Sequence, residues 1–499
     1  MSVLIWFLPI FLVILMMGLP VFFALMAAPG GILLFAGQEN DLKLLYRALY
    51  NGMDSFPLMA LPFFMLAGEV MNRGGITMRL VEFSQAFMGH FRGGLAHVNI
   101  LSSMLFAGLS GSAVADTSAL GSTLIPAMEK NGYTRRFAAA ITAASSVIGP
   151  IIPPSGIMII YAYVMGESVA ALFLAGIVPG ILVGVGLMVM VRLLADKYDL
   201  PKAERIVQRN QTLSTVEYWV SFALLRINIG GLLYALSAPL RDLAGVAVSG
   251  WTAFGLFLIF CGVAHSLLMR YRRAVSSDFR MVCKKAVAPL QTPIIILGGI
   301  LIGVFTPTEA SAIAVAYALI VSFFVLRSMT LRDLIPVLTR SAMASATVLL
   351  LVGAAVSFKT VVALSQAPQI LADAILGLSD NPLILLFLIN ILLFIVGMFL
   401  DAGPAIIILG PILGPIFVDM GVHPVHFAII MSVNLTVGLA TPPMGLVLFV
   451  ASSVSGERVE TIAKAILPFL AVEVVVIFMI TYIPAISMTI PRLAGFVTP

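Results

Sequence analysis

The sequence predicts an all-α, multi-pass membrane protein with inverted-topology repeats, two re-entrant hairpins and two helices broken by glycine and proline. Apolar residues make up 61% of the 499 residues and charged residues only 10%, whereas a soluble domain has about 25% charged residues. Long apolar runs recur along the whole chain, and the glycines and prolines of its two halves follow the same spacing. These observations together indicate the fold class.

The apolar runs predict membrane-spanning helices. A helix needs roughly 20 consecutive apolar residues to cross a bilayer, and the runs here are continuous rather than alternating, which favours a helical bundle over a barrel. The first run, residues 2–17, has neither a basic segment before it nor a cleavage site, so we do not expect a signal peptide. Other runs are 292–306 with 309–326, 343–365 and 462–484.

The net charge of +5 arises from basic residues in short segments. These segments flank two apolar runs, about 213–238 and 246–268, which predict an extra hairpin of two helices. Basic residues gather in cytoplasmic loops under the positive-inside rule. We therefore expect a protein of the bacterial inner membrane that contacts the lipid bilayer and binds no nucleic acid. The basic residues are Lys197, Lys202, Arg205, Arg209, Arg270, Arg272, Arg273, Arg280, Lys284 and Lys285.

An internal repeat relates the two halves of the chain. After a shift of 289 residues, 108–179 aligns with 397–468 without a gap, and nine glycines or prolines coincide. Shared Gly and Pro are informative because they fix backbone geometry. The pairs are Gly108/Gly397, Gly121/Gly410, Pro126/Pro415, Gly132/Gly421, Gly149/Gly438, Pro153/Pro442, Pro154/Pro443, Gly156/Gly445 and Pro179/Pro468.

Charge indicates that the two repeats have opposite orientations. The loop after Pro126 carries Lys130, Arg135 and Arg136, whereas the equivalent loop of the second repeat has Asp419 and no lysine or arginine. The first loop is therefore expected in the cytoplasm and the second outside. Inverted repeats with Gly/Pro-broken segments at matching positions are typical of secondary transporters. The alternative is a pair of ordinary helical hairpins in a structural membrane protein.

The repeat defines the predicted domain boundaries. Residues 1–57 are predicted to form N-terminal scaffold helices, and residues 58–192 the first repeat, with hairpin 108–121 and broken helix 147–156. Residues 193–290 are predicted to hold cytoplasmic connections and the extra hairpin, whose turn lies near Arg241 and Asp242. Residues 291–342 are predicted to form further scaffold helices, and residues 343–487 the second repeat, with hairpin 397–410 and broken helix 437–445.

The broken helices predict ion sites. Segments GPIIPPSG (149–156) and GLATPPMG (438–445) each place adjacent prolines inside an apolar run, where they interrupt the helix. Broken backbone at membrane depth is tolerated only where it is buried in protein or lines a cavity. Freed carbonyl oxygens are ligands for a hard cation, and the N-terminus of a half-helix favours an anion. Each break therefore predicts a cation site beside an anion site.

The hairpin tips supply further oxygen atoms. Ser110 and Ser112 either add hydroxyl ligands at the first tip or pack helices together as small residues. Asp401, at the repeat position of Ser112, is a carboxylate in a membrane segment and costs about 2.5–3.5 kcal/mol there, so it requires a partner, either sodium or a lysine. A cation at Asp401 is expected to bind more tightly than one near Ser112. Asp116 either caps the second arm of its hairpin or contacts a ligand, and Lys359 faces a cavity or snorkels to the surface.

Several motifs in the same order resemble the large membrane subunit of a TRAP (tripartite ATP-independent periplasmic) transporter. The resemblance covers residues 2 to about 487 except roughly 200–288, where the family has a shorter connection. The motifs are LPFFMLAGEVMNRGG (61–75), GLSGSAVADTSALGS (108–122), IGPIIPPSG (148–156), GVFTPTEASAIAVAYAL (303–319) and NLTVGLATPPMG (434–445).

The resemblance implies sodium-driven import of a small organic acid by an elevator motion. The partners would be a small four-helix membrane subunit and a periplasmic substrate-binding protein, and no cofactor other than the coupling sodium ions is expected. The first sodium site would use Ser110, Ser112, Gly149 and Ser155, and the second Asp401, Gly438, Thr441 and Met444. Ser112, Asp116, Pro154, Asn434 and Pro443 are predicted to border the substrate.

Two other functions fit parts of the sequence. One is an ion-coupled anion transporter that works alone, without a binding protein. The other, more remote, is an intramembrane serine protease, since GLSG (108–111) matches a short serine-protease pattern and His265 is a histidine in a membrane segment. The chain has no phosphate-binding loop of the Walker type, so ATP is not expected as the direct energy source. We predict a transporter rather than an enzyme.

Overall fold

The computed structural model describes residues 9–11, 13–14, 17–35, 39–204, 212–237, 250–364, 377, 379 and 381–497. The predicted cytoplasmic residues Arg205 and Arg209, and the turn near Arg241 and Asp242, lie outside the described residues. The side chain of Ser110 is also outside them.

Regular structure in the described part of the chain is helical, apart from one isolated β-bridge between Arg92 and Lys202. Nine helices there are long and apolar enough to cross a membrane, or up to ten if the bent pair Leu42–Met53 and Pro57–Arg73 forms one span. The prediction of an all-α, multi-pass protein is confirmed.

Five consecutive helices in each half match after the shift of 289 residues. The pair α7 and α19 coincides at both ends, and the other pairs begin and end within three residues of the shifted positions. The first set is α6 (Gly94–Ser110), α7 (Ala113–Lys130), α8 (Arg135–Ser146), α9 (Gly156–Met165) and α10 (Val169–Leu194). The second set is α18 (Pro382–Phe399), α19 (Ala402–Asp419), α20 (Pro424–Gly438), α21 (Leu446–Ser455) and α22 (Val459–Tyr482).

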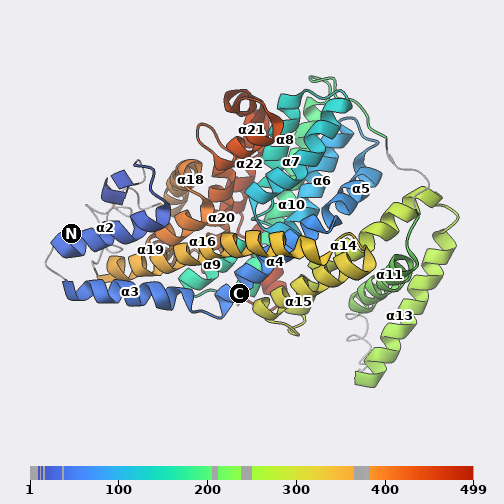
Figure 1. Cartoon of the computed structure of the whole chain (residues 1–499), viewed down its shortest axis with the longest axis horizontal. Helices are drawn as coiled ribbons and strands as arrows, with labels where there is room; N and C mark the ends of the chain where they lie inside the picture. Colours follow the sequence, from blue (N-terminus) through green and yellow to red (C-terminus); the bar gives the residue numbers. More distant parts are fainter. Residues whose placement is uncertain are drawn as a thin grey trace.

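The two repeats pack on each other reciprocally. Helix α9 packs on α19 and its counterpart α21 packs on α7, while α8 packs on α22 and α20 packs on α10. An interface in which equivalent elements exchange the same contacts is the pattern that a two-fold axis produces. The pattern agrees with repeats of opposite direction, and Figure 1 shows the two sets interleaved in the body of the molecule. Their orientation relative to a membrane stays a prediction.

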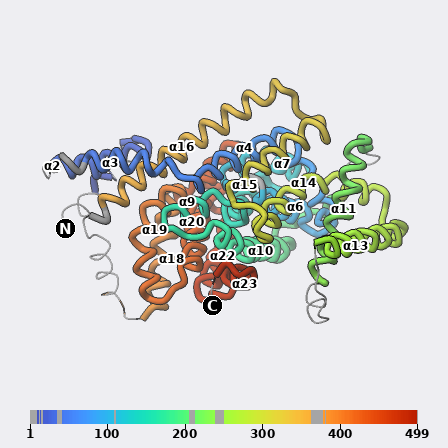
Figure 2. Tube along the Cα trace, turned by 90° about the horizontal axis from the view of Figure 1, so that it is seen from below, coloured from blue at the N-terminus to red at the C-terminus, as the bar shows by residue number. Residues whose placement is uncertain are grey.

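The remaining helices surround this body. Helix α16 has 34 residues and packs on α2, α3, α4 and α19, and Figure 2 shows it along one edge of the molecule. The predicted boundaries at 290/291 and 342/343 fall within the continuous helices α14 and α16. These elements are α2 (Val21–Phe35), α3 (Glu39–Met53), η1 (Pro57–Met59), α4 (Ala60–Arg73), α5 (Ile76–Met88), α14 (Ser277–Leu301), α15 (Pro307–Ile320), η2 (Val321–Val325), α16 (Leu331–Leu364) and α23 (Ala485–Leu493).

Two further helices, α11 (Thr215–Leu236) and α13 (Gly250–Tyr271), occupy the region of the predicted extra hairpin. They pack on each other and project from one end of the molecule, where α11 contacts α14. The ion pair between Arg79 of α5 and the buried Glu217 of α11, at 3.0 Å, anchors this pair of helices. Most of the remaining α11 and α13 surface is exposed and apolar, as expected for helices that face lipid.

Candidate functional site

The first break separates α8 from α9. Pro153 and Pro154 have no N–H groups, so the carbonyls of Gly149 and Pro150, four residues earlier, lose their helical donors. The Pro150 oxygen accepts a hydrogen bond from the hydroxyl of buried Ser155 instead. Ser155 also caps α9 by accepting from the Met158 N–H at 3.3 Å. Within the described residues no hydrogen bond reaches the Gly149 oxygen, which is left as a candidate ligand.

The first hairpin tip lies against this break. Gly111 ends α6 in the left-handed region with φ of 61°, which favours glycine. A Cβ atom on Gly111 would lie 2.6 Å from the carbonyl oxygen of Pro154, so the tip and the proline turn are in direct contact. Ser112 then begins α7 and its hydroxyl accepts from the Ala115 N–H at 3.4 Å.

Asp116 also belongs to this break. It lies in the first turn of α7 with 0% of its surface exposed, and a Cβ atom on Gly149 would lie 2.2 Å from its Oδ2 atom. The structure therefore places a carboxylate against the break, next to the Gly149 carbonyl. Together with the Ser112 and Ser155 hydroxyls, these are oxygen donors of the kind that hard cations prefer. The sequence assigned a carboxylate ligand for sodium to the second tip only and left Asp116 open between a helix cap and a ligand contact. The structure places Asp116 against the first break.

The second break separates α20 from α21, and its carbonyl oxygens accept hydrogen bonds from backbone N–H groups. The Gly438 oxygen accepts from the Thr441 N–H at 2.9 Å, and the Leu439 oxygen accepts from the Val447 N–H at 3.0 Å. The Thr441 oxygen in turn accepts from the Gly445 N–H at 3.0 Å. Carbonyl oxygens have two lone pairs, so each of these still has capacity for an ion.

The second hairpin approaches its break through glycine. A Cβ atom on Gly438 would lie 2.5 Å from the Cα atom of Gly397, so α18 and α20 touch backbone to backbone. Asp401 begins α19, accepts from the Ala402 N–H at 2.8 Å and is exposed. In the described part of the chain no ion pair joins Asp401 to a lysine or arginine, and no hydrogen bond joins it to the 439–445 turn. The lysine partner that the sequence left open as the alternative to sodium is therefore not found there.

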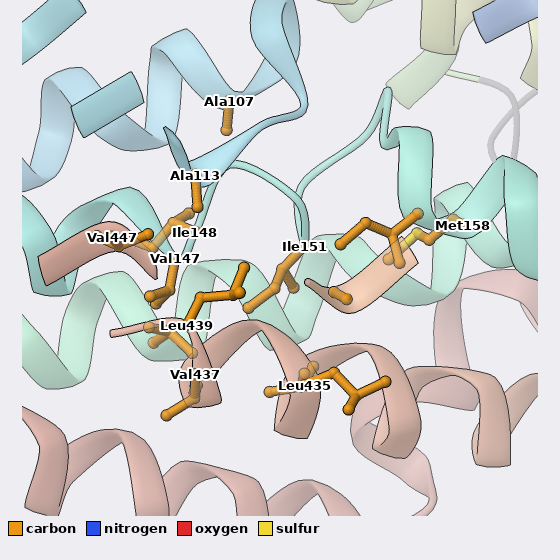
Figure 3. Packing of buried hydrophobic residues seen from close by; sticks show 14 of the residues in the cluster. Ala107, Ala113, Val147, Ile148, Ile151, Met158, Leu435, Val437, Leu439 and Val447 are labelled. Atoms are coloured by element: carbon orange, nitrogen blue, oxygen red, sulfur yellow. The ribbon is translucent and has the colours of Figure 1, made fainter. Parts of the chain in front are cut away.

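An apolar cluster lies between the two breaks. Figure 3 shows Val147 and Ile151 of the first break close to Val437 and Leu439 of the second, with Val447 of α21 beside them. All five side chains are buried. The breaks therefore share one dry core, and their polar atoms lie at its borders.

A cavity of about 1070 Å³ opens beside the second break. Exposed Pro443 lines it together with Arg458 and Lys464, whereas the equivalent Pro154 is buried. A neighbouring cleft of about 430 Å³ shares Lys464 and adds Arg136, a residue predicted to face the cytoplasm. Sequence reasoning missed Arg458 and Lys464, although both lie soon after the apolar half-helix that follows the proline turn.

Asn434 is buried in a polar network rather than on a cavity. Its Nδ2 atom donates to Asn390 Oδ1 at 2.6 Å, and that oxygen also accepts from the Thr481 hydroxyl at 3.1 Å. The equivalent residue, Ser145, likewise donates to the side-chain oxygen of an asparagine, Asn99, at 3.1 Å. Both repeats thus tie the first arm of the hairpin to the first half of the broken helix. A substrate contact of Asn434 stays a prediction.

The other predicted residues occupy different environments. Met444 is 55% exposed and Ser112 is partly buried. Lys359 of α16 donates from Nζ to the carbonyl oxygen of Val164 in α9 at 2.6 Å, which links a scaffold helix to the first repeat. His265 accepts a hydrogen bond from Arg226 Nε at 2.9 Å within the α11–α13 pair.

The fold and this site define a class of protein: a multi-pass helical transport protein with paired broken helices. The comparisons name the family. The sequence model of "Tripartite ATP-independent periplasmic transporter, DctM component" matches residues 8–486, and the chain belongs to this family. It is the large permease of a three-part transporter, so the family resemblance is confirmed.

Individual relatives agree with this assignment. The chain is 35% identical over 479 residues to the sialic acid TRAP transporter large permease protein SiaM of Vibrio cholerae, covering 95% of each protein. It is 35% identical over 464 residues to the C4-dicarboxylate TRAP transporter large permease protein DctM of Pseudomonas aeruginosa, covering 93% of this chain and 92% of that protein. The crystal structure of the Alcanivorax borkumensis YdaH transporter shares the fold, with a TM-score of 0.53, 18% identity and 88% of each chain covered.

Proposed function

We propose that this permease imports a small organic acid across the bacterial inner membrane, coupled to sodium, after a periplasmic binding protein delivers the acid. The observation that carries the proposal is the pair of equivalent breaks, each with a carboxylate on its hairpin tip or just after it. Asp116 lies against the first break and Asp401 begins the second arm of the second hairpin. Oxygen-rich breaks of this kind suit a hard monovalent cation.

Sodium would be held at the first break by Asp116, the Gly149 carbonyl and the Ser112 and Ser155 hydroxyls. At the second break Asp401 supplies the charge, and the carbonyls near Gly438, Thr441 and Met444 supply neutral oxygens. A bound cation offsets the cost of a carboxylate at membrane depth. When bound, sodium contributes a positive charge beside the half-helix N-termini, where the carboxylate of the substrate is also stabilised.

The charge around the open cavity supports an anionic substrate. Arg458 and Lys464 line its wall beside Pro443, together with one acid, Glu460. The lining therefore carries a net positive charge that would attract a carboxylate entering this space. The names of the relatives SiaM and DctM refer to sialic acid and C4-dicarboxylates, which are both organic acids. Because the cavity opens on the side of Arg136, this conformation corresponds to release into the cytoplasm.

Movement of the two repeats against the scaffold would complete the cycle as an elevator motion. The long helix α16 packs on α19, and Lys359 reaches the Val164 carbonyl at the end of α9. These contacts lie between the parts that would slide, so the Lys359 hydrogen bond has to break and re-form in each cycle.

Uptake in proteoliposomes tests the ion dependence. The complete system of permease, small subunit and binding protein should accumulate a C4-dicarboxylate or a sialic acid under an inward sodium gradient. Uptake should stop when the gradient is dissipated. Equal rates in potassium or choline would refute sodium coupling.

The same vesicles test the role of the partner. At micromolar acid, uptake should require the binding protein, because the open cavity of the permease has few groups to select a dilute substrate. Full-rate uptake by the membrane subunits alone would favour the alternative of a stand-alone anion transporter.

A further inference from the structure

A carboxyl group unrelated to either break lies at the centre of the second repeat. Glu473 occupies the middle of the buried stripe of α22, which also includes Ile466, Phe469, Ile477 and Thr481. The spacing of three or four residues places this stripe on one face of the helix. Glu473 is 0% exposed, and within the described residues neither of its carboxyl oxygens has a hydrogen-bond partner. Sequence analysis passed over it, although it is an acid inside the apolar run 462–484.

No cation within the described residues neutralises Glu473. The helices packed on α22 are α8, α10, α18, α20 and α21, and their ionisable groups are few. Arg135 pairs with Glu129 at 3.2 Å, and His426 interacts with the Ser487 hydroxyl and the Thr481 carbonyl. The remaining groups are Arg136 at the start of α8, Arg192 near the end of α10, and Glu460, Lys464 and Tyr482 near the two ends of α22 itself.

An ionised carboxylate is far more costly than a neutral acid in such surroundings. It would have neither water, nor a cation, nor a hydrogen-bond donor to stabilise its charge. Adding a proton removes the charge and leaves only an unpaired hydroxyl and carbonyl. Glu473 is therefore a neutral acid in this conformation.

The first repeat has no acid at the position equivalent to Glu473, so packing of the repeat fold does not require one. The position equivalent to Glu473 is Gly184 in α10. A Cβ atom there would lie 2.4 Å from the sulfur of Met104, so the first repeat fills the space from a different helix. The second repeat thus places an ionisable group where its counterpart has no side chain.

A cleft lies about two helical turns before Glu473 along α22. The 430 Å³ cleft at the Arg136 end is lined by Phe137 and Lys464. The Phe137 ring packs edge-on against Phe469, with 5.7 Å between ring centroids. Phe469 precedes Glu473 by one helical turn on the same face. The Phe137–Phe469 contact therefore lies between the cleft and the turn of α22 that carries Glu473.

We propose that Glu473 is a proton-binding site that exchanges its proton through this cleft during the transport cycle. A hydronium ion in the cleft gives its proton to the carboxylate and leaves as water when the Phe137–Phe469 contact opens, and the reverse step releases the proton. Import would then carry or counter-transport a proton in addition to sodium. This inference rests on the proposed transport function for its coupling, but the proton site itself does not.

Infrared spectroscopy of the purified full-length chain tests the site without transport. At neutral pH the wild type should show the carbonyl band of a protonated, weakly hydrogen-bonded carboxylic acid. Glu473→Gln should lack that band, because the glutamine side chain has no carboxylic acid group. Asp419→Asn, which changes an exposed carboxyl at the end of α19, should retain it. A wild-type spectrum from which Glu473→Gln removes nothing would overturn the site.

Proteoliposomes with an internal pH dye test the coupling. During uptake of a C4-dicarboxylate or a sialic acid, the wild type and Asp419→Asn should move protons, and Glu473→Gln should lose at least tenfold of that movement. Equal proton movement in Glu473→Gln, or uptake without protons in the wild type, would overturn the coupling. If no variant took up either acid, the proposed function would be weakened instead, while the infrared band would still decide the proton site.

Discussion

The two breaks share a backbone plan but differ in access. At the first, Pro154, Ser155 and Asp116 are buried and the hairpin tip touches the proline turn. At the second, Pro443 and Asp401 are exposed and a large cavity opens beside the turn. The comparison teaches that equivalent breaks can be closed and open in one conformation.

One residue pair accounts for part of this difference. Gly111 at the first tip adopts a left-handed conformation, and its lack of a side chain allows contact with the Pro154 oxygen. The equivalent residue is Leu400, which is extended with φ of −119°. A leucine cannot reproduce the glycine turn at low cost. The second tip is therefore built differently from the first.

The largest effect is expected on stability at Gly438, where the backbones of α18 and α20 touch. In Gly438→Ala the new Cβ atom would lie 2.5 Å from Gly397 Cα, and a helix must move to accept it. Overpacking typically costs about 1–3 kcal/mol, and we expect the upper end, seen as a lower thermal unfolding temperature. Gly410→Ala is the matched control, because its Cβ atom would meet only the Met165 side chain at 3.5 Å. Equal losses in both variants would show that the close approach is unimportant.

The next largest effect concerns the buried carboxylate. Asp116→Asn keeps the size of the side chain and removes its charge at the closed break. Between unit charges about 4 Å apart the attraction is roughly 4 kcal/mol at an effective dielectric of about 20, and much of it is offset by desolvation. A net loss of about 2 kcal/mol, or roughly thirtyfold in half-saturating sodium concentration, is expected. A sodium titration of uptake measures it, and an unchanged midpoint would remove Asp116 from the first site.

Asp401→Asn should have a smaller effect, because the exposed Asp401 side chain has fewer neighbouring groups to hold an ion than the fully buried Asp116. We expect about 1 kcal/mol, or roughly fivefold in half-saturating sodium. The order Asp116 before Asp401 reverses the sequence-based expectation that the second site binds sodium more tightly. In that expectation Asp116 was open between a helix cap and a ligand contact. The same titration, with expression and insertion checked, decides the order. A larger shift for Asp401→Asn would restore the sequence-based expectation.

Ser112→Ala should cost less than either, because water can replace a hydroxyl ligand. A two- to threefold rise in half-saturating sodium, or about 0.5 kcal/mol, is expected. Ser118→Ala is a control on the exposed side of the same helix. If the two variants behaved alike, Ser112 would act only as the helix cap.

The smallest effect on uptake is expected from removing the extra helices. Replacing 213–268 by a short polar linker deletes α11 and α13 but also removes Glu217, the partner of Arg79. The deletion should therefore be made with Arg79→Gln, and Arg79→Gln alone is its control. Sodium-dependent uptake should stay within about twofold of that control, since neither helix contacts a break. A folded deletion that bound sodium but did not transport would show that the helices take part in the motion.

Sequence reasoning predicted the class, the repeat and both breaks because glycine, proline and long apolar runs constrain the backbone locally. Gly149 and Gly438 are examples, since each marks the end of a half-helix in the structure. The contact between Gly149 and Asp116 could not be predicted in the same way. It depends on how α7 lies against the break, and spacing along the chain leaves capping and ligand contact equally open.

The sequence also does not indicate which of the two breaks is open to a cavity. Pro154 and Pro443 occupy equivalent positions, and no local pattern indicates that one is buried and the other lines a cavity with Arg458 and Lys464. Glu473 could have been found as a lone acid in an apolar run, but its lack of a partner is a property of five packed helices. Such features follow from tertiary packing rather than from local propensity.

The ratio of sodium to substrate tests the central claim, that each break holds a sodium ion with its own carboxylate, most directly. Proteoliposomes with the complete transporter would be supplied with radioactive sodium and the transported acid. At the sodium concentration that half-saturates the wild type, Asp116→Asn and Asp401→Asn should each carry less sodium per acid than the wild type, and the double variant the least. A wild-type ratio in both single variants would contradict the account.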